Sequence, residues 1–181
     1  SNKKVWWKCE KGGDHEWKTS VVHRTNGKGC PVCANKKIVV SNSLSTLNPE
    51  LAKEWHSTKN GGLTTDKVGT GSNKKVWWKC SKGKDHEWEA IIVNRNKGIG
   101  CPICSNKKII ISNSLATTNP ELAKQWHPTK NGQLTPYNVS LGSSKKVWWK
   151  CSKFNEHEWQ SVIKNRKRGD GCTICSKHKI V

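Results

Sequence analysis

Residues 74–104 read KKVWWKCSKGKDHEWEAIIVNRNKGIGCPIC, and this stretch decides the fold because it holds three cysteines and one histidine at set intervals. Five residues separate Cys80 from His86, fourteen separate His86 from Cys101, and two separate Cys101 from Cys104. Two close ligand pairs joined by a longer segment are typical of a small tetrahedral zinc site. A complete four-ligand set leaves no open position on the ion, so we expect a structural site.

The pattern occurs three times in the 181 residues, shifted by 71 residues per copy. Three cysteines per copy is an odd number, so disulfides cannot close each copy by itself, and bridges between copies would not explain the histidine. The Cys-x2-Cys pair alone is also compatible with a redox motif, and iron is the alternative metal. We expect three Zn²⁺ ions, and the predicted ligands are Cys9, His15, Cys30, Cys33, Cys80, His86, Cys101, Cys104, Cys151, His157, Cys172 and Cys175.

A second repeated segment, Asn-Pro-Glu-Leu-Ala-Lys-x-Trp-His, occurs at 48–56 and 119–127. Internal repetition at a fixed period indicates a tandem array. The predicted modules are 1–40, which lacks the front segment, 41–111 and 112–181. The absence of methionine and of a signal-peptide pattern suggests a piece of a longer protein.

The local patterns predict a small metal-stapled α+β fold. Lys74 to Cys80 alternates as a strand with Val76 and Trp78 toward the core, and a second strand is expected to run from Trp88 to Arg95. Asn48, followed by Pro and Glu, predicts the start of a helix of about two turns. Each module is therefore expected to be a short β-hairpin with two zinc-ligand turns, a zinc ribbon or the related treble clef, with a short helix in the two complete modules.

These segments, with Lys-Val-Trp-Trp-Lys-Cys, His-Glu-Trp and Gly-Cys-Pro-x-Cys, resemble a family of probable zinc-ribbon, treble-clef-like domains of unknown function that occur as tandem repeats. The resemblance covers nearly the whole chain. Some members look joined to restriction-endonuclease-like domains, so the resemblance implies nucleic-acid recognition and a nuclease domain in the full-length protein. The third copy departs slightly, with Phe154 near its histidine and Thr173 in its Cys-x2-Cys turn.

Composition points to a metal and to a polyanionic partner. Only 33% of the residues are apolar, so a unit of this size needs a staple. Free thiolate ligands imply a reducing, intracellular compartment, and we favour the cytoplasm of a prokaryote or of a virus-infected host. No apolar run is long enough to span a membrane. The net charge of +20 suits a regularly charged polymer such as DNA, although lysines could also serve solubility alone.

The candidate nucleic-acid contacts recur at fixed places in the copies. An arginine precedes each variable turn, and we expect the arginine to contact phosphate and the turn to read bases, although pairing with a strand carboxylate such as Glu89 is the alternative for Arg95. Lysines flank a strand tryptophan that could stack on a base or pack beneath the helix. The predicted contacts are Arg24, Asn26, Lys28, Arg95, Asn96, Lys97, Arg166, Lys167, Arg168, Lys4, Lys75, Lys146, Lys59, Asn60, Lys130 and Asn131.

The function expected from these patterns is binding of double-stranded DNA by a tandem zinc array, as the targeting part of a larger nuclease-type protein. The alternatives are an RNA or single-strand binder and a protein-interaction adaptor. We do not expect an enzyme, because the chain has no Ser-His-Asp pattern and no phosphate-cradling glycine motif. In addition, too few carboxylates recur at the same position of each copy to hold catalytic metals.

Overall fold

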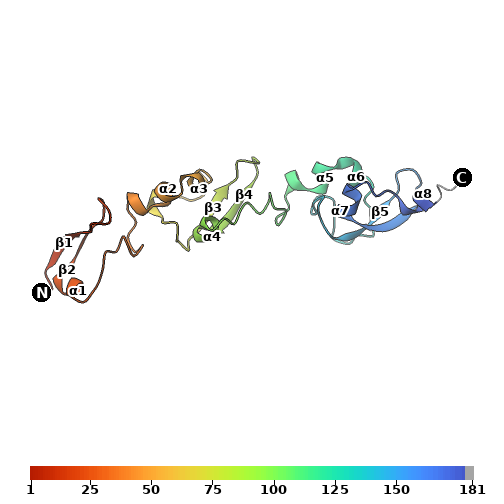
Figure 1. The fold of residues 1–181 in the computed structure, drawn as a ribbon. Coiled ribbons are helices and arrows are strands. Elements are labelled where there is room, and N and C mark those ends of the chain that lie inside the picture. The colour runs from red at the N-terminus through yellow and green to blue at the C-terminus, as the bar shows by residue number, and fades with distance from the viewer. Residues whose placement is uncertain (178–181) are drawn as a thin grey trace. The chain divides into compact units, whose positions relative to one another are not determined.

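The computed structural model describes residues 1–177, so residues 178–181 of the predicted third module lie outside the described part. The chain divides into two compact units, Ser1–Gly100 and Cys101–Val181. Antiparallel two-stranded hairpins recur along the chain (Figure 1). Their strands are β1 (Lys4–Lys8) with β2 (Glu16–Ser20), β3 (Lys75–Lys79) with β4 (Glu87–Ile91), and β5 (Lys146–Lys150) with β6 (Glu158–Val162).

Each hairpin buries one face, as the alternation of its first strand predicts. In β3, Val76 and Trp78 are 3% and 0% exposed, whereas Lys75 and Lys79 are exposed. Trp78 lies directly opposite Trp88 of β4, so two indoles share the core face of the pair. The predicted orientation of this strand is confirmed.

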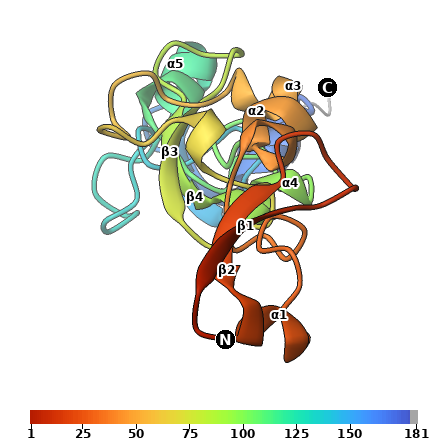
Figure 2. The same ribbon diagram turned by 90° about the vertical axis from the view of Figure 1, so that its left-hand side faces the viewer.

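The second strand is shorter than predicted. The expectation that it continues to Arg95 is wrong, because the backbone leaves β4 after Ile91 and turns into α4 (Ile92–Asn96). In that helical turn, residues three apart share a face, so Ile92 and Arg95 both reach the core. The same turn follows the other hairpins as α1 (Val21–Thr25) and α7 (Ile163–Lys167), and Figure 2 shows α1 just beyond the end of β2.

Short helical turns precede the second and third hairpins. The first set is η1 (Val40–Asn42), α2 (Leu44–Leu47), α3 (Pro49–Ala52) and η2 (Thr65–Lys67), and the second is η3 (Ile111–Asn113), α5 (Leu115–Thr118) and α6 (Pro120–Ala123). The last described element is α8 (Thr173–Lys177).

The predicted helix start is confirmed, but its predicted length is wrong. The Asn48 side chain accepts a hydrogen bond from the Leu51 N–H at 3.1 Å, and Pro49 begins the helix. The helix α3 ends at Ala52, and the Glu54 and Trp55 N–H groups bond only three residues back. The Glu54 carbonyl and the His56 N–H then pair with β3. Trp55 therefore forms a β-bridge with Trp78, and the two rings meet edge to face with centroids 5.4 Å apart.

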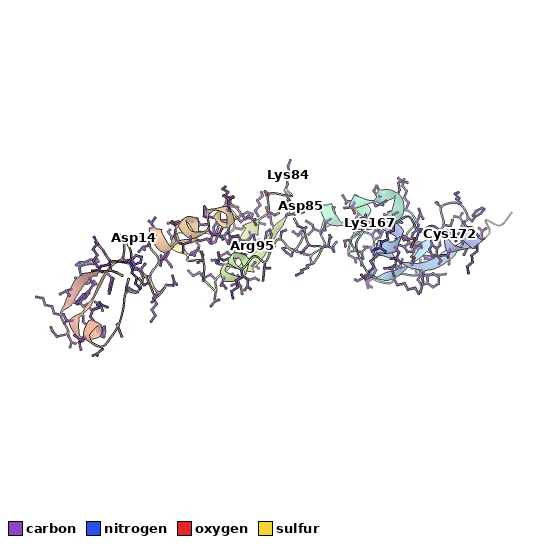
Figure 3. The ribbon with its side chains drawn as sticks, viewed as in Figure 1. Asp14, Lys84, Asp85, Arg95, Lys167 and Cys172 are labelled. Atoms are coloured by element: carbon purple, nitrogen blue, oxygen red, sulfur yellow. The ribbon has the colours of Figure 1, made fainter. Side chains whose placement is uncertain are left out.

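An arginine fills the space between two core tryptophans in each module. Arg95 of α4 (Figure 3) is 7% exposed, and its guanidinium lies 5.3 Å from the Trp78 ring and 5.2 Å from the Trp88 ring. It donates hydrogen bonds to the Glu54 carboxylate and to the Ile99 carbonyl. The contacts of Arg95 therefore lie within the module.

The other two copies repeat this arrangement with different partners. Arg166 is 9% exposed and donates to the Gln125 side chain and the Asp170 carbonyl. Burial lowers the pKa of Arg166. Arg24 is half-buried and donates to the Lys28 carbonyl at 2.7 Å.

Replacing Arg95 with alanine tests its part in the core. Arg95→Ala removes the filling between two tryptophans and the partner of Glu54, so we expect a loss of about 2–4 kcal/mol in the free energy of unfolding. Glu54→Gln should cost less than about 1 kcal/mol, because Gln125 makes the same contact in the third module. Urea unfolding of zinc-loaded protein, followed by tryptophan fluorescence, measures both; equal losses would contradict the assignment.

Candidate metal centre

The hairpin turn supplies two ligands of each predicted site. Cys9 follows β1 and His15 precedes β2, and the Cys9 N–H donates to the His15 carbonyl at 3.0 Å. Gly12 lies under the imidazole, where a Cβ atom would come within 2.6 Å of His15 Cδ2. Glycine at this position therefore leaves room for the imidazole ring in the first copy. In the third copy, Phe154 stands at the corresponding position and its ring contacts His157 with centroids 4.9 Å apart.

The second turn supplies the other two ligands. In the first copy, the Lys36 and Lys37 N–H groups both donate to the Pro31 carbonyl, and Asn35 adopts a left-handed conformation with φ of 53°. This tight turn carries Cys30 and Cys33 on one side. In the third copy, Thr173 stands in place of proline and begins the helical turn α8, which carries Cys175 to its site.

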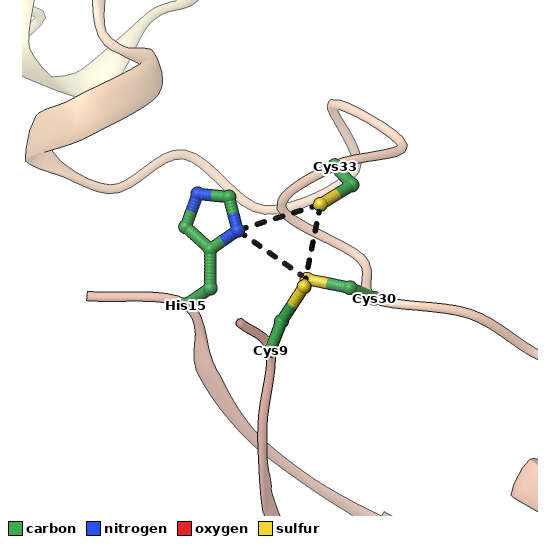
Figure 4. A group of neighbouring side chains, drawn as sticks. All are labelled: Cys9, His15, Cys30 and Cys33. Carbon is green, nitrogen blue, oxygen red and sulfur yellow. Dashed lines mark hydrogen bonds between the residues drawn. The ribbon is translucent and has the colours of Figure 1, made fainter. Parts of the chain in front are cut away.

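The ligand atoms converge in all three copies. In the first site (Figure 4), Cys9 Sγ lies 3.7 Å from Cys33 Sγ, and His15 Nδ1 lies 3.4 Å from Cys33 Sγ and 3.8 Å from Cys30 Sγ. Within each group of four, all ligand atoms lie within 4.8 Å of one another; the groups are Cys9, His15, Cys30 and Cys33, then Cys80, His86, Cys101 and Cys104, then Cys151, His157, Cys172 and Cys175.

These spacings fit zinc. A tetrahedron of sulfur atoms about 2.3 Å from a central ion has edges of about 3.8 Å. The sulfur–sulfur distance of 3.7 Å in the first site matches that edge and is far too long for a disulfide, whose sulfurs lie about 2.05 Å apart. The nine cysteines are unbridged. The predicted ligand sets are thus brought together as three zinc-type centres, one per module.

The charges of the thiols also call for a cation. Burial raises the pKa of Cys33 to about 11, and hydrogen bonds with and repulsion from Cys9 and Cys30 add to the shift. The pKa of Cys175 is raised to about 11 by burial and by Cys172 and Cys151. Three thiolates at this spacing repel one another, and a divalent ion at their centre removes that penalty.

A second layer of groups orients His15 in the first site. His15 Nδ1 faces the sulfurs, and its Nε2 lies 3.2 Å from Ser41 Oγ. The Ser41 hydroxyl and N–H donate to the two Asp14 carboxylate oxygens at 2.7 Å and 2.8 Å, so Ser41 Oγ is left to accept the Nε2 proton. These bonds from Ser41 lower the pKa of Asp14. The relay fixes the tautomer in which Nδ1 is available as a ligand.

The sequence reasoning missed Asp14 and Ser41. Ser41 belongs to η1, beyond the predicted end of the first module, and Asn42 beside it donates to the carbonyls of Val32 and Lys37. A signal was present, because Val-Ser-Asn-Ser-Leu at 40–44 recurs as Ile-Ser-Asn-Ser-Leu at 111–115. A polar stretch after a ligand pair, repeated with the ligands, was the clue to an outer coordination layer.

A β-hairpin with one ligand pair in its turn, a second pair in a following tight turn, and short helices define a small treble clef zinc module. The chain matches the model of a family described as a probable treble clef zinc finger domain over residues 1–36, 51–107 and 122–178. The chain therefore belongs to this family. A search of curated proteins gives no significant match. Within residues 1–177, no helix reaches the length and hydropathy that crossing a bilayer requires.

Several of the predicted nucleic-acid contacts have partners inside their own module. The buried positions of Arg95 and Arg166 and their internal hydrogen bonds give them a packing role, which corrects the expectation that they face phosphate. The side chains that bond Arg95 and Arg166 come from the segment that precedes each hairpin, and the strand carboxylate Glu89 is not among them. Arg24, half-buried between Trp7 and Trp17, follows the same arrangement.

The loop residues after the predicted helix also have internal partners. Asn60 bonds the backbone of Trp77, and Lys59 pairs with Glu87 while lying 4.6 Å from the Trp77 ring. Lys59 and His56 lower the pKa of Glu87 to about 2. In the other complete module, Asn131, Lys130 and Glu158 make the same contacts, with Lys130 4.9 Å from the Trp148 ring. His56 and His127 accept hydrogen bonds from backbone N–H groups of the loop that follows each of them.

The remaining predicted contacts stay at the surface. Lys75 pairs with Glu89 at 2.9 Å across the strands. The turns after α1, α4 and α7 expose their polar side chains, and the exposed residues of the prediction are Lys4, Asn26, Lys28, Lys75, Asn96, Lys97, Lys146, Lys167 and Arg168.

Metal removal tests the centres directly. We expect three zinc ions per chain by mass spectrometry, and two after Cys9→Ser. Apparent zinc-binding free energies of about 10–16 kcal/mol exceed the stability of a typical small domain, so chelation should unfold the modules. Far-ultraviolet circular dichroism before and after chelation measures this, and an unchanged spectrum in metal-free protein would contradict a structural role.

Ser41→Ala tests the outer layer. Loss of the relay to His15 should lower the zinc affinity of the first site about ten- to hundredfold. The site formed by Cys151, His157, Cys172 and Cys175 is an internal control whose affinity should not change. Chelator competition, with each site assigned by cadmium NMR, measures the affinity of each site separately. An equal affinity of the first site in the wild-type protein and in Ser41→Ala would show that Ser41 does not support the site.

Proposed function

We infer that this chain is a binding module array whose partner is double-stranded DNA. The observation that supports this most strongly is the surplus of surface cations. The chain has 33 Lys and Arg residues against 13 Asp and Glu residues. A duplex carries a regular row of phosphates, and neutralising them releases counterions and supplies affinity without sequence dependence.

Many of the carboxylates form ion pairs with basic side chains of the same chain. Most of the carboxylates lie in pairs with lysine or arginine within residues 1–177, namely Glu16, Glu50, Glu54, Glu87, Glu89, Glu121 and Glu158. The cations outside these pairs therefore act on a surface with little opposing charge. This balance favours a polyanion as partner over an acidic small molecule.

The ligand turns present some of these cations in a fixed conformation. Lys107 and Lys108 follow Cys104, and both are exposed. Their N–H groups donate to the Pro102 carbonyl at 2.8 Å and 3.0 Å, and Asn106 adopts a left-handed conformation with φ of 56°. A metal-linked turn holds the two side chains with less loss of backbone entropy than a flexible loop would require, which suits contacts to phosphate.

The exposed turns after α4 and α7 supply a second set of polar groups. Asn96 ends α4 and Lys97 follows it, Lys167 ends α7 and Arg168 follows it, and the residues at these two repeat positions differ between the copies. Variable polar residues on a constant scaffold suit reading of base edges, so sequence preference would come from these turns. The chain resembles a family in which some members look joined to nuclease-like domains. This resemblance supports a targeting role within a larger intracellular protein, in which the array binds and does not catalyse.

A salt titration tests the proposal. The logarithm of the association constant for a duplex should fall linearly with the logarithm of salt concentration, with a slope of about −0.9 per phosphate contact. Lys107→Ala with Lys108→Ala should flatten the slope by about 1.8 if both contact phosphate. Fluorescence anisotropy of a labelled duplex at several salt concentrations measures the slope.

Lys53→Ala with Lys124→Ala is the matched control. These two lysines pair with Glu50 at 2.6 Å and with Glu121 at 2.7 Å, so their removal changes the slope less. Salt-independent binding, or no binding of any duplex by the zinc-loaded chain, would contradict the proposal. Tighter binding to an acidic protein than to nucleic acid would favour the adaptor alternative.

A further inference from the structure

Each of the two complete modules has a groove in which the buried arginine lies beside a zinc-ligand cysteine. In the second module the groove has a volume of about 800 Å³, and Cys80 and Arg95 are among its lining residues. In the third module the volume is about 610 Å³, and Cys151 and Arg166 occupy the equivalent places. The arginine and a ligand cysteine therefore share one space in both modules.

The same arginine also bonds the segment that carries the second ligand pair. Arg166 donates to the carbonyl of Asp170, two residues before Cys172, and Arg95 makes the equivalent bond in the second module. Burial lowers the pKa of Arg166. The negative charges of Cys172, Asp170 and Cys151 act in the opposite direction and raise it. The guanidinium is therefore close enough to two ligands of the third centre to act on them electrostatically.

The charge of the metal centre makes a buried cation beside it favourable. Three thiolates, one neutral imidazole and a Zn²⁺ ion carry a net charge of −1. Arg95 and Arg166 are 7% and 9% exposed, so water screens their positive charges little. The Nε–H group of each is buried without a hydrogen-bond acceptor among the described residues, so hydrogen bonds satisfy each guanidinium only in part. A negatively charged thiolate centre compensates the remaining charge.

The two modules differ in the side chain that the arginine binds in the preceding segment. Arg95 pairs with the Glu54 carboxylate, whereas Arg166 bonds the neutral Gln125 amide. The charges of the centre and the arginine therefore cancel in the third module, and the carboxylate adds a negative charge in the second. Asp170 is exposed and forms no ion pair with Arg166 in the described part of the chain, so it offsets the guanidinium less than a direct partner does.

We propose that the residue at this repeat position, Glu54 or Gln125, sets the nucleophilicity of the zinc-bound thiolates through the buried arginine. An uncompensated guanidinium stabilises negative charge on the sulfurs and lowers their reactivity, whereas a carboxylate partner offsets it and leaves the sulfurs more electron-rich. The second centre is tuned towards reaction with small uncharged electrophiles, which the groove beside Cys80 admits. The third centre is tuned towards inertness. This property of the metal centres is independent of nucleic-acid binding.

Reaction with N-ethylmaleimide measures this property. The thiolate sulfur forms a bond to one alkene carbon of the reagent, the carbon–carbon double bond becomes a single bond, and water supplies a proton to the other carbon. No oxidant or reductant is consumed. The product is a neutral thioether, which is a poorer zinc ligand than the thiolate.

The test exchanges the two side chains in the zinc-loaded chain of 181 residues. Glu54→Gln should slow alkylation of the second centre about three- to tenfold, because the nucleophilicity of a thiolate falls with its basicity. Gln125→Glu should accelerate alkylation of the third centre by a similar factor. Tryptic peptides 98–107 and 169–177 each carry two ligands and differ in sequence, so mass spectrometry follows both rates in one chain. The first centre, followed through peptide 29–36, should keep its rate in both variants.

Glu50→Gln is the matched control. Glu50 lines the same groove, but its side chain is 78% exposed and pairs with Lys53 instead of the arginine. Removing this carboxylate makes the same change in charge as Glu54→Gln, and water screens it more strongly. The alkylation rate of the second centre should therefore be unchanged.

The opposite directions of the two expected effects separate charge from stability. A loss of stability opens the metal centres more often, so it would accelerate alkylation in both Glu54→Gln and Gln125→Glu. Slower alkylation of the second centre together with faster alkylation of the third supports the proposal. An unchanged rate after either replacement, acceleration in both variants, or an effect of Glu50→Gln as large as that of Glu54→Gln would overturn it.

Discussion

The whole structure depends on four ligands from two separate turns meeting at one point. Three sulfurs and one imidazole nitrogen meet at these spacings, where three thiolates would repel one another. Burial first, and then the neighbouring Cys9 and Cys30, raises the pKa of Cys33 to about 11. A divalent ion turns the repulsion into attraction and joins the hairpin turn to the second ligand turn. Every other element is short: a five-residue strand such as β3 or a one-turn helix such as α4 has little stability in isolation. The ion therefore supplies the order that a larger apolar core would otherwise provide.

Around this centre, the interior is built from tryptophan and arginine, which suits a chain with 33% apolar residues. Arg95 between Trp78 and Trp88 fills core space with its planar guanidinium and hydrogen-bonds to Glu54 of the front segment. The outer layer of the first centre reaches further along the chain. Ser41 bonds His15, and Ser43, two residues later, caps α2 by accepting the Thr46 N–H. A metal centre and the start of the next module thus share one short, hydrogen-bonded segment.

The three copies keep the scaffold and vary its surface. Lys18, Glu89 and Gln160 occupy one repeat position, and each faces the equivalent tryptophan across the hairpin. The metal centre tolerates these exchanges because they lie on the outer face of the strand. Such an arrangement separates stability, which resides in the ligands and the Trp–Arg core, from surface chemistry, which varies in exposed turns and strand faces. Each module of such an array can therefore present different surface chemistry while all modules share the same metal ligands and Trp–Arg core.

The sequence by itself determined the ligand sets, their number, the hairpins and the Asn48 helix cap. These features follow from local spacing, strand alternation and capping, which act over a few residues. It did not determine where the second strand ends or which way the arginine points. Arg95 follows a strand-like run, and the helical turn there places its guanidinium between two core tryptophans, as the turns α1 and α7 do for Arg24 and Arg166. The Asp14–Ser41–His15 relay was likewise decided by tertiary structure, because hydrogen bonds across 27 residues are not encoded in any local pattern.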